Sequence, residues 1–298
     1  MKQRERLSKH ASGRGSLVKA SGACNLPAGL AAGSAVRRIC RLFEDFRYRH
    51  DVHSVFSDFC EMAAIAISNS VDLMPYGPRE TRYMGLISGY EPPLQGLFPR
   101  ILGELVLAFE TGPGDVMGEV FHELGLHNRH AGQFFTPYPL CRLAAMMQVG
   151  DGSALRQMIN EKGYVTLSEP ACGAGAMIVA FAQAMREAGL NYQRHLHVTA
   201  VDIDRRAVHM AYLQLSLMHI PATLVVGDTL RLIEHEHWHT PAHVLGGWST
   251  RLRRGSTPDA EISESAREGD CPVEHDFQAK RGPADMTNDR EEEMRGTF

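Results

Sequence analysis

Apolar residues recur at helical spacing in the first half of the chain. Between residues 52 and 66 they stand three or four positions apart, which predicts an amphipathic helix. A second such pattern covers residues 97–109 and stops at the glycine- and proline-rich turn 111–114. A third helix is expected to begin at Asp115, because aspartate commonly caps helix N-termini. We therefore expect residues 41–130 to form a helical domain.

From residue 163 the pattern alternates between short apolar strands and helices. The strands are YVTLS, LHVTAV and ATLVV, and the helices between them are AMIVAFAQAMREAG and DRRAVHMAYLQLSLMHI. Strands separated by helices of this length predict βαβ units and a parallel sheet covered on both faces. The expected fold class is α/β, and ligands of such sheets bind at the carboxyl ends of the strands.

Composition and cysteine usage narrow the class of protein. The chain has 298 residues, of which 44% are hydrophobic, so it is long enough for a real core. Apolar runs of about 18 residues are missing, and we expect no membrane span. The basic first residues lack the apolar stretch of a secretory signal, which predicts a cytoplasmic location. The six cysteines form no CxxC pair and are expected to be reduced thiols.

Charge is unevenly distributed between the two ends. Residues 1–40 are rich in lysine and arginine, and an arginine cluster continues to Arg49. We expect a basic, poorly ordered leader there, which either contacts nucleic acid phosphates or is simply solvated. Residues 251–298 are polar, acidic and rich in glycine, serine and proline, so they are expected to form a disordered tail.

The stretch SEPACGAGAM, residues 168–177, stands where the first predicted strand ends and a helix begins. Glycines at 173 and 175 allow a tight turn and let a ligand approach without meeting a Cβ atom. The N-terminus of the following helix offers free N–H groups and partial positive charge to an anionic group. The sequence therefore predicts a small-molecule site at this turn.

Acidic residues follow the ends of three successive strands, at Glu169, Asp202 and Asp228. Asp202, after the second strand, can accept hydrogen bonds from ribose hydroxyls. Asp228, after the third strand, can accept a hydrogen bond from an exocyclic amine. The dinucleotide pattern G-x-G-x-x-G is incomplete, because Ile178 stands three positions after Gly175. A nucleoside without a pyrophosphate fits better, and S-adenosyl-L-methionine is such a nucleoside.

Four segments carry a resemblance to a known family. GQFFTPYPL at 132–140, followed by SEPACGAGAM, VDIDRRAV and VVGDTL, resembles the N-6 adenine-specific DNA methylase family, especially methylase subunits of type I restriction-modification systems and their plasmid-borne homologues. The resemblance implies a Rossmann-like S-adenosylmethionine-dependent methyltransferase domain at residues 131–250, with an incomplete sheet, behind a helical domain. It also implies DNA as partner and substrate, and a specificity or other restriction-modification subunit as a candidate partner.

The family pattern assigns cofactor-binding roles to individual positions. It implies that the cofactor contacts Phe134, Phe135, Thr136 and Pro137 at its methionine end, Glu169, Ala171, Gly173 and Gly175 in the glycine turn, Asp202 at the ribose and Asp228 at the adenine. Independently of the resemblance, Thr136 is expected to cap the next helix, with Pro137 at its first position.

Catalytic residues cannot be assigned in the same way. The family uses an Asn/Asp-Pro-Pro-aromatic tetrapeptide after a fourth strand to hold a flipped adenine, and this sequence contains none. Thr240-Pro241-Ala242-His243 stands near the expected place but supplies neither the amide nor the second proline. Two hypotheses remain open: an adenine-specific DNA methyltransferase with an unusual or separately supplied catalytic segment, and a non-catalytic accessory protein of the same fold.

Two tryptophans and several histidines after residue 233, including His243, are further candidates for function. Trp238 or Trp248 could stack on a base, but a role in the core is favoured. Imidazoles at His235, His237 and His239 would share one face of a strand, which is one way to chelate a metal. Acids or thiols that would complete the ligand set are not found at familiar spacing, so no metal site is predicted.

Overall fold

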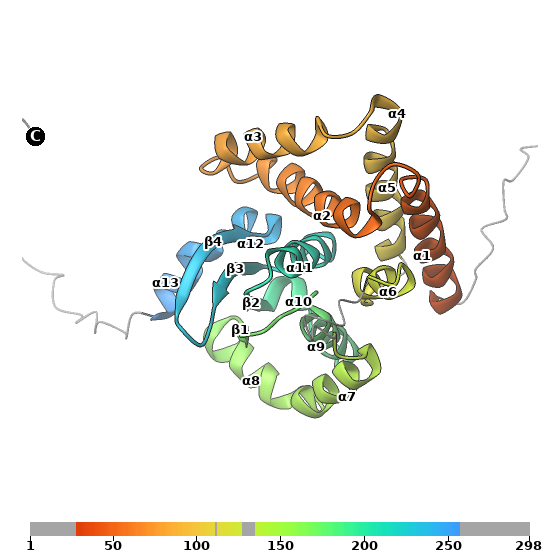
Figure 1. Cartoon of the computed structure of the whole chain (residues 1–298). Coiled ribbons are helices and arrows are strands. Elements are labelled where there is room, and N and C mark those ends of the chain that lie inside the picture. The colour runs from red at the N-terminus through yellow and green to blue at the C-terminus, as the bar shows by residue number, and fades with distance from the viewer. Residues whose placement is uncertain (1–27, 111, 127–134, 257–298) are drawn as a thin grey trace, which may run out of the picture. The chain divides into compact units, whose positions relative to one another are not determined.

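The computed structural model describes residues 28–110, 112–126 and 135–256, and every structural statement below refers to these (Figure 1). The N-terminal part consists of helices α1 (Ala28–Glu44), α2 (Val52–Asn69), α3 (Tyr76–Ile87), α4 (Pro92–Gln95), α5 (Leu97–Glu110) and α6 (Val116–Glu123). The second part contains strands β1 (Val165–Glu169), β2 (Leu196–Asp202), β3 (Ala222–Asp228) and β4 (Ile233–His239). Its helices are α7 (Tyr138–Val149), α8 (Ser153–Lys162), α9 (Ala176–Glu187), α10 (Tyr192–His195), α11 (Arg205–Leu217), α12 (Pro241–Leu245) and α13 (Trp248–Ser256).

The three predicted N-terminal helices are present as α2, α5 and α6. Asp51 caps α2, since its carboxylate accepts a hydrogen bond from the Ser54 amide at 2.9 Å. Asp115 caps α6 as expected and accepts from the Gly118 amide at 3.1 Å. Aromatic rings fill the space between these helices and α1: Phe43 of α1 packs edge-on against Phe59 of α2, with ring centroids 5.5 Å apart. The apolar stripes read from the sequence are therefore the faces that build this core.

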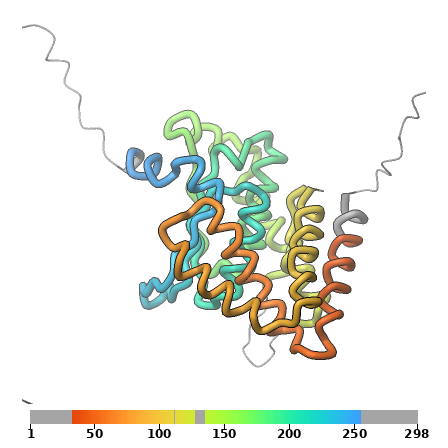
Figure 2. Tube along the Cα trace, turned by 90° about the horizontal axis from the view of Figure 1, so that it is seen from above, coloured from red at the N-terminus to blue at the C-terminus, as the bar shows by residue number. Residues whose placement is uncertain are grey.

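Helix α1 extends into the segment that was expected to be a leader. It begins at Ala28, lies beside α5 (Figure 2), and buries Ala35, Val36 and Ile39 to 6% exposure or less. Arg37 between these apolar positions is exposed, so α1 is itself an amphipathic helix. At the other end, α13 continues to Ser256, past the expected start of the tail at 251. The predicted boundaries at 40 and 250 thus fall inside helices, and the domain limits remain predictions.

The sheet confirms the α/β fold class. Strands β1, β2 and β3 are parallel, with Val165 opposite Leu196 and Val198 opposite Ala222. Helix α9 follows β1 and α11 follows β2, as the alternating pattern predicts. Helix α11 contacts both the sheet and α2, so it forms the layer between the sheet and the N-terminal helices. The acids that follow β1, β2 and β3 consequently share the carboxyl edge of the sheet.

Strand β4 departs from the expected parallel arrangement, because it pairs antiparallel to β3. The connection between them, residues 229–232, is too short for a crossover, and two strands joined this closely can only form a hairpin. A bulge lies at Val226/Gly227, where a Cβ atom on Gly227 would come 2.5 Å from the Ile233 carbonyl oxygen. As a result β4 starts at the carboxyl edge and ends at the opposite edge.

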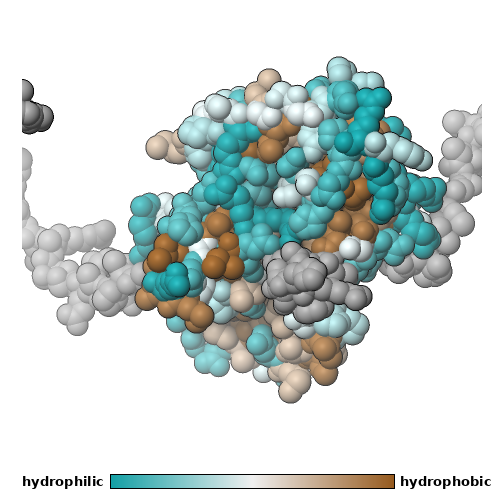
Figure 3. Space-filling model, in the orientation of Figure 1, coloured by the Kyte–Doolittle hydropathy of each residue, from teal (hydrophilic) through white to brown (hydrophobic). Residues whose placement is uncertain are grey.

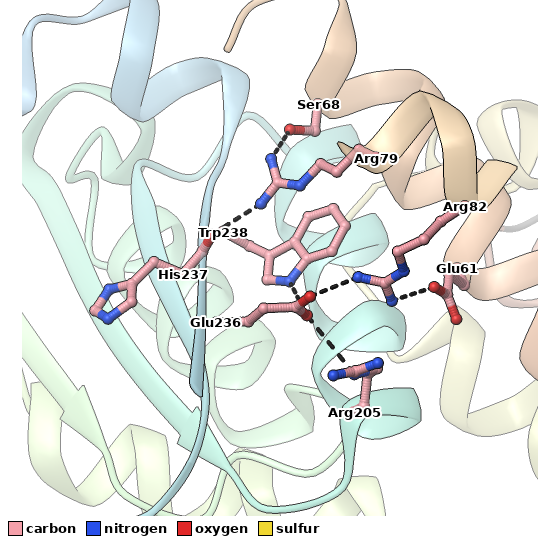
Figure 4. Close-up of polar contacts among 8 residues, drawn as sticks. All are labelled: Glu61, Ser68, Arg79, Arg82, Arg205, Glu236, His237 and Trp238. Carbon is pink, nitrogen blue, oxygen red and sulfur yellow. Dashed lines mark hydrogen bonds and ion pairs between the residues drawn. The ribbon is translucent and has the colours of Figure 1, made fainter. Parts of the chain in front are cut away.

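Two arginines of α3 hold β4 against the N-terminal helices (Figure 4). The Arg79 guanidinium lies 3.7 Å from the centre of the Trp238 ring and donates to the His237 carbonyl oxygen at 2.8 Å. Arg82 bridges Glu61 of α2 and Glu236 of β4. Because the outer side of β4 is covered by these cations, a strand as polar as IEHEHWH can stay at the edge of the sheet.

Helix α7 is apolar on two sides. Cys141, Ala145 and Val149 are buried toward the core, whereas Leu140 and Leu143 are each 57% exposed. Figure 3 shows apolar side chains among hydrophilic ones on the face that includes α7. A helix that is apolar on two sides has weak amphipathic periodicity, so spacing alone does not predict it.

The imidazoles of three histidines cluster at the edge of the sheet where β4 ends. His197 Nε2 lies 2.9 Å from His243 Nδ1, and the His239 and His243 rings stack with centroids 4.5 Å apart. The other nitrogen of His243 lies 2.9 Å from Ser249 Oγ. Burial lowers the pKa of His197 to about 3 and that of His243 to about 4, and the neighbouring imidazoles add to both shifts. These side chains are therefore neutral at pH 7.

We predict that replacing Trp238 by alanine lowers the free energy of unfolding by about 3–5 kcal/mol, because the ring is fully buried between Arg79 and α11. Urea unfolding at pH 7 measures the change. Leu230→Ala is the control, since Leu230 is 96% exposed and its loss should cost less than about 0.5 kcal/mol. A Trp238→Ala cost below about 1 kcal/mol would contradict the packing described.

We also predict that stability decreases as the pH falls from about 6.5 toward 4, before most carboxylates titrate. The unfolded chain binds protons on His197 and His243 at their ordinary pKa, whereas the folded chain binds them only near pH 3–4. The difference favours the folded state above pH 6.5 and is lost through this window. Urea midpoints between pH 7 and 4.5 measure the slope. It should become shallower in His197→Phe but stay unchanged in the exposed control His235→Gln, and equal slopes would refute the assignment.

Candidate functional site

The turn between β1 and α9 has the conformation that its glycines predict. Gly173 has φ +53° and Gly175 has φ +90°, a region that other residues seldom adopt. A Cβ atom on Gly173 would lie 3.1 Å from the Phe135 ring, and one on Gly175 would lie 3.3 Å from Ala211 Cβ. Both backbone geometry and space therefore require glycine at these positions. We call residues 170–175 the glycine loop.

Asp202 fastens the glycine loop to the end of β2. Its Oδ2 accepts a hydrogen bond from the Gly173 amide at 2.8 Å, and its Oδ1 accepts one from the Asp204 amide at 2.9 Å. The Cys172 amide donates to the Val201 carbonyl oxygen at 2.9 Å. These contacts place the Asp202 carboxylate directly beside the glycines.

Glu169 lies at the end of β1, on the same edge of the sheet. Its carboxylate accepts a long hydrogen bond, 3.4 Å, from the Ala171 amide. Partial burial raises the pKa of Glu169, and the negative charge of Asp202 raises it further. Two carboxylates that disfavour each other's charge form an electrostatic environment that favours a cationic ligand group.

Asp228 is engaged in the hairpin that follows β3. Its Oδ1 accepts hydrogen bonds from the amides of Leu230 and Arg231, at 3.0 and 3.1 Å. The neighbouring Thr229 hydroxyl donates to the Pro170 carbonyl oxygen at 2.7 Å and so ties the hairpin to the glycine loop. Asp228 thus lies at the predicted edge, but its carboxylate already stabilises a turn.

A cavity of about 340 Å³ opens above the glycine loop. Its lining includes six of the predicted site residues: Phe135, Thr136, Glu169, Ala171, Gly173 and Asp202. Three others, Pro137, Gly175 and Asp228, are described but do not line it. Phe134 lies outside the described residues. The cavity is also lined by five residues that were not predicted from the sequence: Cys141, Cys172, Ala174, Ala176 and Met177.

Signals for most of these additional residues were present in the sequence. Cys172, Ala174, Ala176 and Met177 all belong to the quoted stretch SEPACGAGAM. Cys141 lies one helical turn after Pro137, on the buried side of α7. Burial raises the pKa of the Cys172 thiol well above its ordinary value, and that of Cys141 is raised for the same reason. Both cysteines therefore line the cavity as neutral thiols.

The predicted cap of α7 was wrong by one residue. The N-cap is Pro137, whose carbonyl oxygen accepts from the Leu140 amide at 2.9 Å, and α7 begins at Tyr138. Pro139 stands at the second position of the helix, where a residue without an N–H is also tolerated. Thr136 is consequently exposed and free of the capping role, and its side chain lines the cavity instead.

The segment Thr240-Pro241-Ala242-His243 lies at the opposite edge of the sheet. Residue 239, the last of β4, pairs with Thr223 near the start of β3, so the segment follows the edge remote from the glycine loop. The Thr240 hydroxyl donates to the Ile220 carbonyl oxygen at 2.8 Å and accepts from the Ala222 amide at 2.9 Å. This segment is therefore bonded to the start of β3, at the open end of the hairpin, and does not line the cavity.

Both tryptophans are core residues, as favoured from the sequence. Trp238 is 0% exposed and packs on Tyr212, and Trp248 is 2% exposed and packs on His197. Within the described parts of the chain, no group of three or more histidine, cysteine or acidic side chains is arranged to hold a metal ion. The described helices also include none that is both long and apolar enough to cross a membrane.

Comparison with known proteins yields one family match and one structural similarity. Residues 114–245 match the family model described as N-6 DNA Methylase, and a search of curated protein sequences finds no significant match. A crystal structure from Listeria monocytogenes, provisionally named a class I S-adenosylmethionine-dependent methyltransferase, is similar with a TM-score of 0.38 and 14% sequence identity. The alignment covers 66% of this chain and 55% of that one. The matched residues 114–245, which include the glycine loop and all four strands, are thus similar to the N-6 DNA methylase family.

Proposed function

We propose that this chain binds S-adenosyl-L-methionine in the cavity above the glycine loop. The observation that carries the proposal is the convergence of Glu169, Asp202 and the positive-φ Gly173 on one cavity. A side chain at position 173 would meet Phe135, so the bare backbone there lets the Phe135 ring pack against the glycine loop at the cavity. The family match supports the choice of ligand.

Each polar group of the cavity suits one part of that nucleoside. The carboxylate of Glu169 suits the cationic amino group of the methionine portion, and the free N–H groups at the start of α9 suit its carboxylate. Asp202 suits the ribose hydroxyls, while Phe135 and Thr136 line the side assigned to the methionine end. Pro137, Gly175 and Ala171 would act by shaping the backbone. Asp228 would bind the adenine amine only with Oδ2, which lies 3.6 Å from Arg231 Nε in an exposed ion pair.

We propose adenine in DNA as the methyl acceptor class, following the family that residues 114–245 match. The bound cofactor would supply an electrophilic methyl group for transfer to the exocyclic amine. A restriction-modification role, a specificity subunit as partner and a cytoplasmic location belong to the same proposal. The basic N-terminal residues would add sequence-independent, salt-dependent attraction to phosphates.

A non-catalytic accessory role is the second candidate, and one observation favours it for the chain alone. The sequence has no Asn/Asp-Pro-Pro-aromatic tetrapeptide, and the nearest substitute, residues 240–243, follows the edge of the sheet remote from the cavity. Binding of the cofactor does not require that tetrapeptide, whereas orienting the amine of a flipped base does. The two candidates therefore make the same prediction for binding and different ones for transfer.

We predict that Asp202→Ala weakens S-adenosylmethionine binding by about tenfold or more, because a charged hydrogen-bond partner is worth about 1.5–3 kcal/mol. Titration calorimetry on the folded proteins measures the affinity. Asp151→Ala is the matched control, since Asp151 also accepts a backbone amide, from Ser153 at 2.9 Å, but at the start of α8. A folded wild-type protein that binds no cofactor would disprove the proposal.

We predict that the purified chain alone transfers no methyl group to DNA. The measurement is incorporation of tritiated methyl from S-adenosylmethionine into unmethylated plasmid DNA, with an active adenine methyltransferase as positive control. Incorporation that is lost in Asp202→Ala would reject the accessory role and identify the chain as an enzyme. The same assay with a candidate specificity subunit tests whether a partner supplies the missing catalytic segment.

A further inference from the structure

A buried amide lies directly beneath the glycine loop. Gln214 of α11 is 0% exposed, and its Nε2 donates to the Ala174 carbonyl oxygen at 2.7 Å and to Asp115 Oδ1 at 3.0 Å. Its Oε1 accepts from the Met117 amide at 3.1 Å. Both N–H groups and the oxygen of this amide are thus used, each by a different partner. A glutamate could not donate to Ala174, and a leucine would satisfy none of the three.

The partners of Gln214 come from two separate parts of the fold. Ala174 stands between the two glycines of the loop, while Asp115 is the N-cap of α6 and Met117 belongs to its first turn. Asp115 is 4% exposed, and its Oδ1 also accepts from the Gly118 amide. A Cβ atom on Gly118 would collide with this carboxylate. The glycine loop is therefore linked through one side chain to the last helix of the N-terminal part.

This link determines which way one peptide of the loop faces. The Ala174 carbonyl points down to Gln214, and the amide of the same peptide, on Gly175, donates to the Cys172 carbonyl oxygen at 2.8 Å. Without Gln214 the buried Ala174 carbonyl oxygen would have lost this hydrogen-bond donor, which costs free energy. A rotation of the Ala174–Gly175 peptide that turned the carbonyl toward the open cavity would relieve this cost. Glycine at 175 makes such a rotation sterically accessible. The rotated carbonyl would then occupy ligand space.

We propose that Gln214 is a positioning residue, which holds the glycine loop in its ligand-binding conformation by fixing the Ala174 peptide and anchoring it to α6. This inference rests on the proposed function, because it concerns the same cavity. It extends the site to a residue of α11 and to the N-cap of α6, neither of which lines the cavity.

The test compares Gln214→Leu with two controls in the full chain. Leu215→Ala removes a neighbouring core side chain that is also 0% exposed, and so reports the effect of lost stability alone. Gln193→Leu removes another amide, which donates to the Met218 carbonyl oxygen at 3.1 Å away from the loop. Three quantities are measured: the melting temperature, the affinity for S-adenosylmethionine, and hydrogen–deuterium exchange of residues 171–176 without ligand.

We expect Gln214→Leu to weaken cofactor binding about tenfold and to accelerate exchange in the loop and at residues 117–118. Leu215→Ala should lower the melting temperature without a comparable change in affinity, and Gln193→Leu should resemble the wild type. Unchanged loop exchange in folded Gln214→Leu would overturn the inference, and so would an equal loss of affinity in Leu215→Ala.

The outcomes also separate this inference from the proposed function. If the folded wild type binds no cofactor, the proposed function fails, while loop exchange in the variants still shows whether Gln214 holds the loop. If Gln214→Leu does not fold, Gln214→Asn replaces it, because an amide one methylene shorter cannot span both Ala174 and Asp115. Wild-type loop exchange in that variant would equally overturn the inference.

Discussion

The candidate site depends on a backbone that turns through two positive-φ residues between β1 and α9. This turn exposes polar backbone groups in a space that is largely buried, so each of them needs a partner. Asp202 supplies one from β2, the Val201 carbonyl supplies another, and Gln214 supplies the third from α11. The acids and the amide around the loop therefore act as structural partners of the backbone before any ligand arrives. A ligand that uses Asp202 shares its carboxylate with the Gly173 amide.

The position of the N-terminal helices follows from the same need for partners. Helix α6 is linked to the glycine loop through the contacts of Asp115 and Met117 with Gln214. Helix α3 is linked to β4 where Arg79 stacks on Trp238 and where Arg82 pairs with Glu236. These contacts attach the N-terminal helices to the glycine loop and to strand β4. Because the N-cap of α6, Asp115, is connected to the glycine loop through Gln214, this helix contributes to the structure of the candidate site although it precedes the α/β part in sequence.

Much of this arrangement could be predicted from local sequence patterns. The helices α2, α5 and α6 follow from apolar spacing and an aspartate cap, and the glycine loop follows from two glycines after an apolar strand. The strand-end acids could be placed because parallel strands share one carboxyl edge. The direction of β4 was harder to predict, since it depends on the length of its connection and on cations from α3, which lie more than 150 residues earlier. Gln214 looks like an ordinary polar residue of an amphipathic helix, and only the fold shows that its amide is buried beneath the loop.

The two edges of the sheet differ in chemistry, and this difference limits what the chain can do. The carboxyl edge gathers carboxylates around a cavity, with a raised pKa at Glu169, which favours a ligand with a cationic group. The opposite edge gathers buried imidazoles that stay neutral and that contact Thr223, Ser249 and Trp248 in a packed layer. Because β4 is antiparallel to β3, the residues that follow β4 lie at the opposite edge and not at the carboxyl edge. The polar groups that would orient a methyl acceptor must therefore come from a segment other than the one that follows β4. The antiparallel direction of β4 is thus the strongest constraint on any mechanism for this chain.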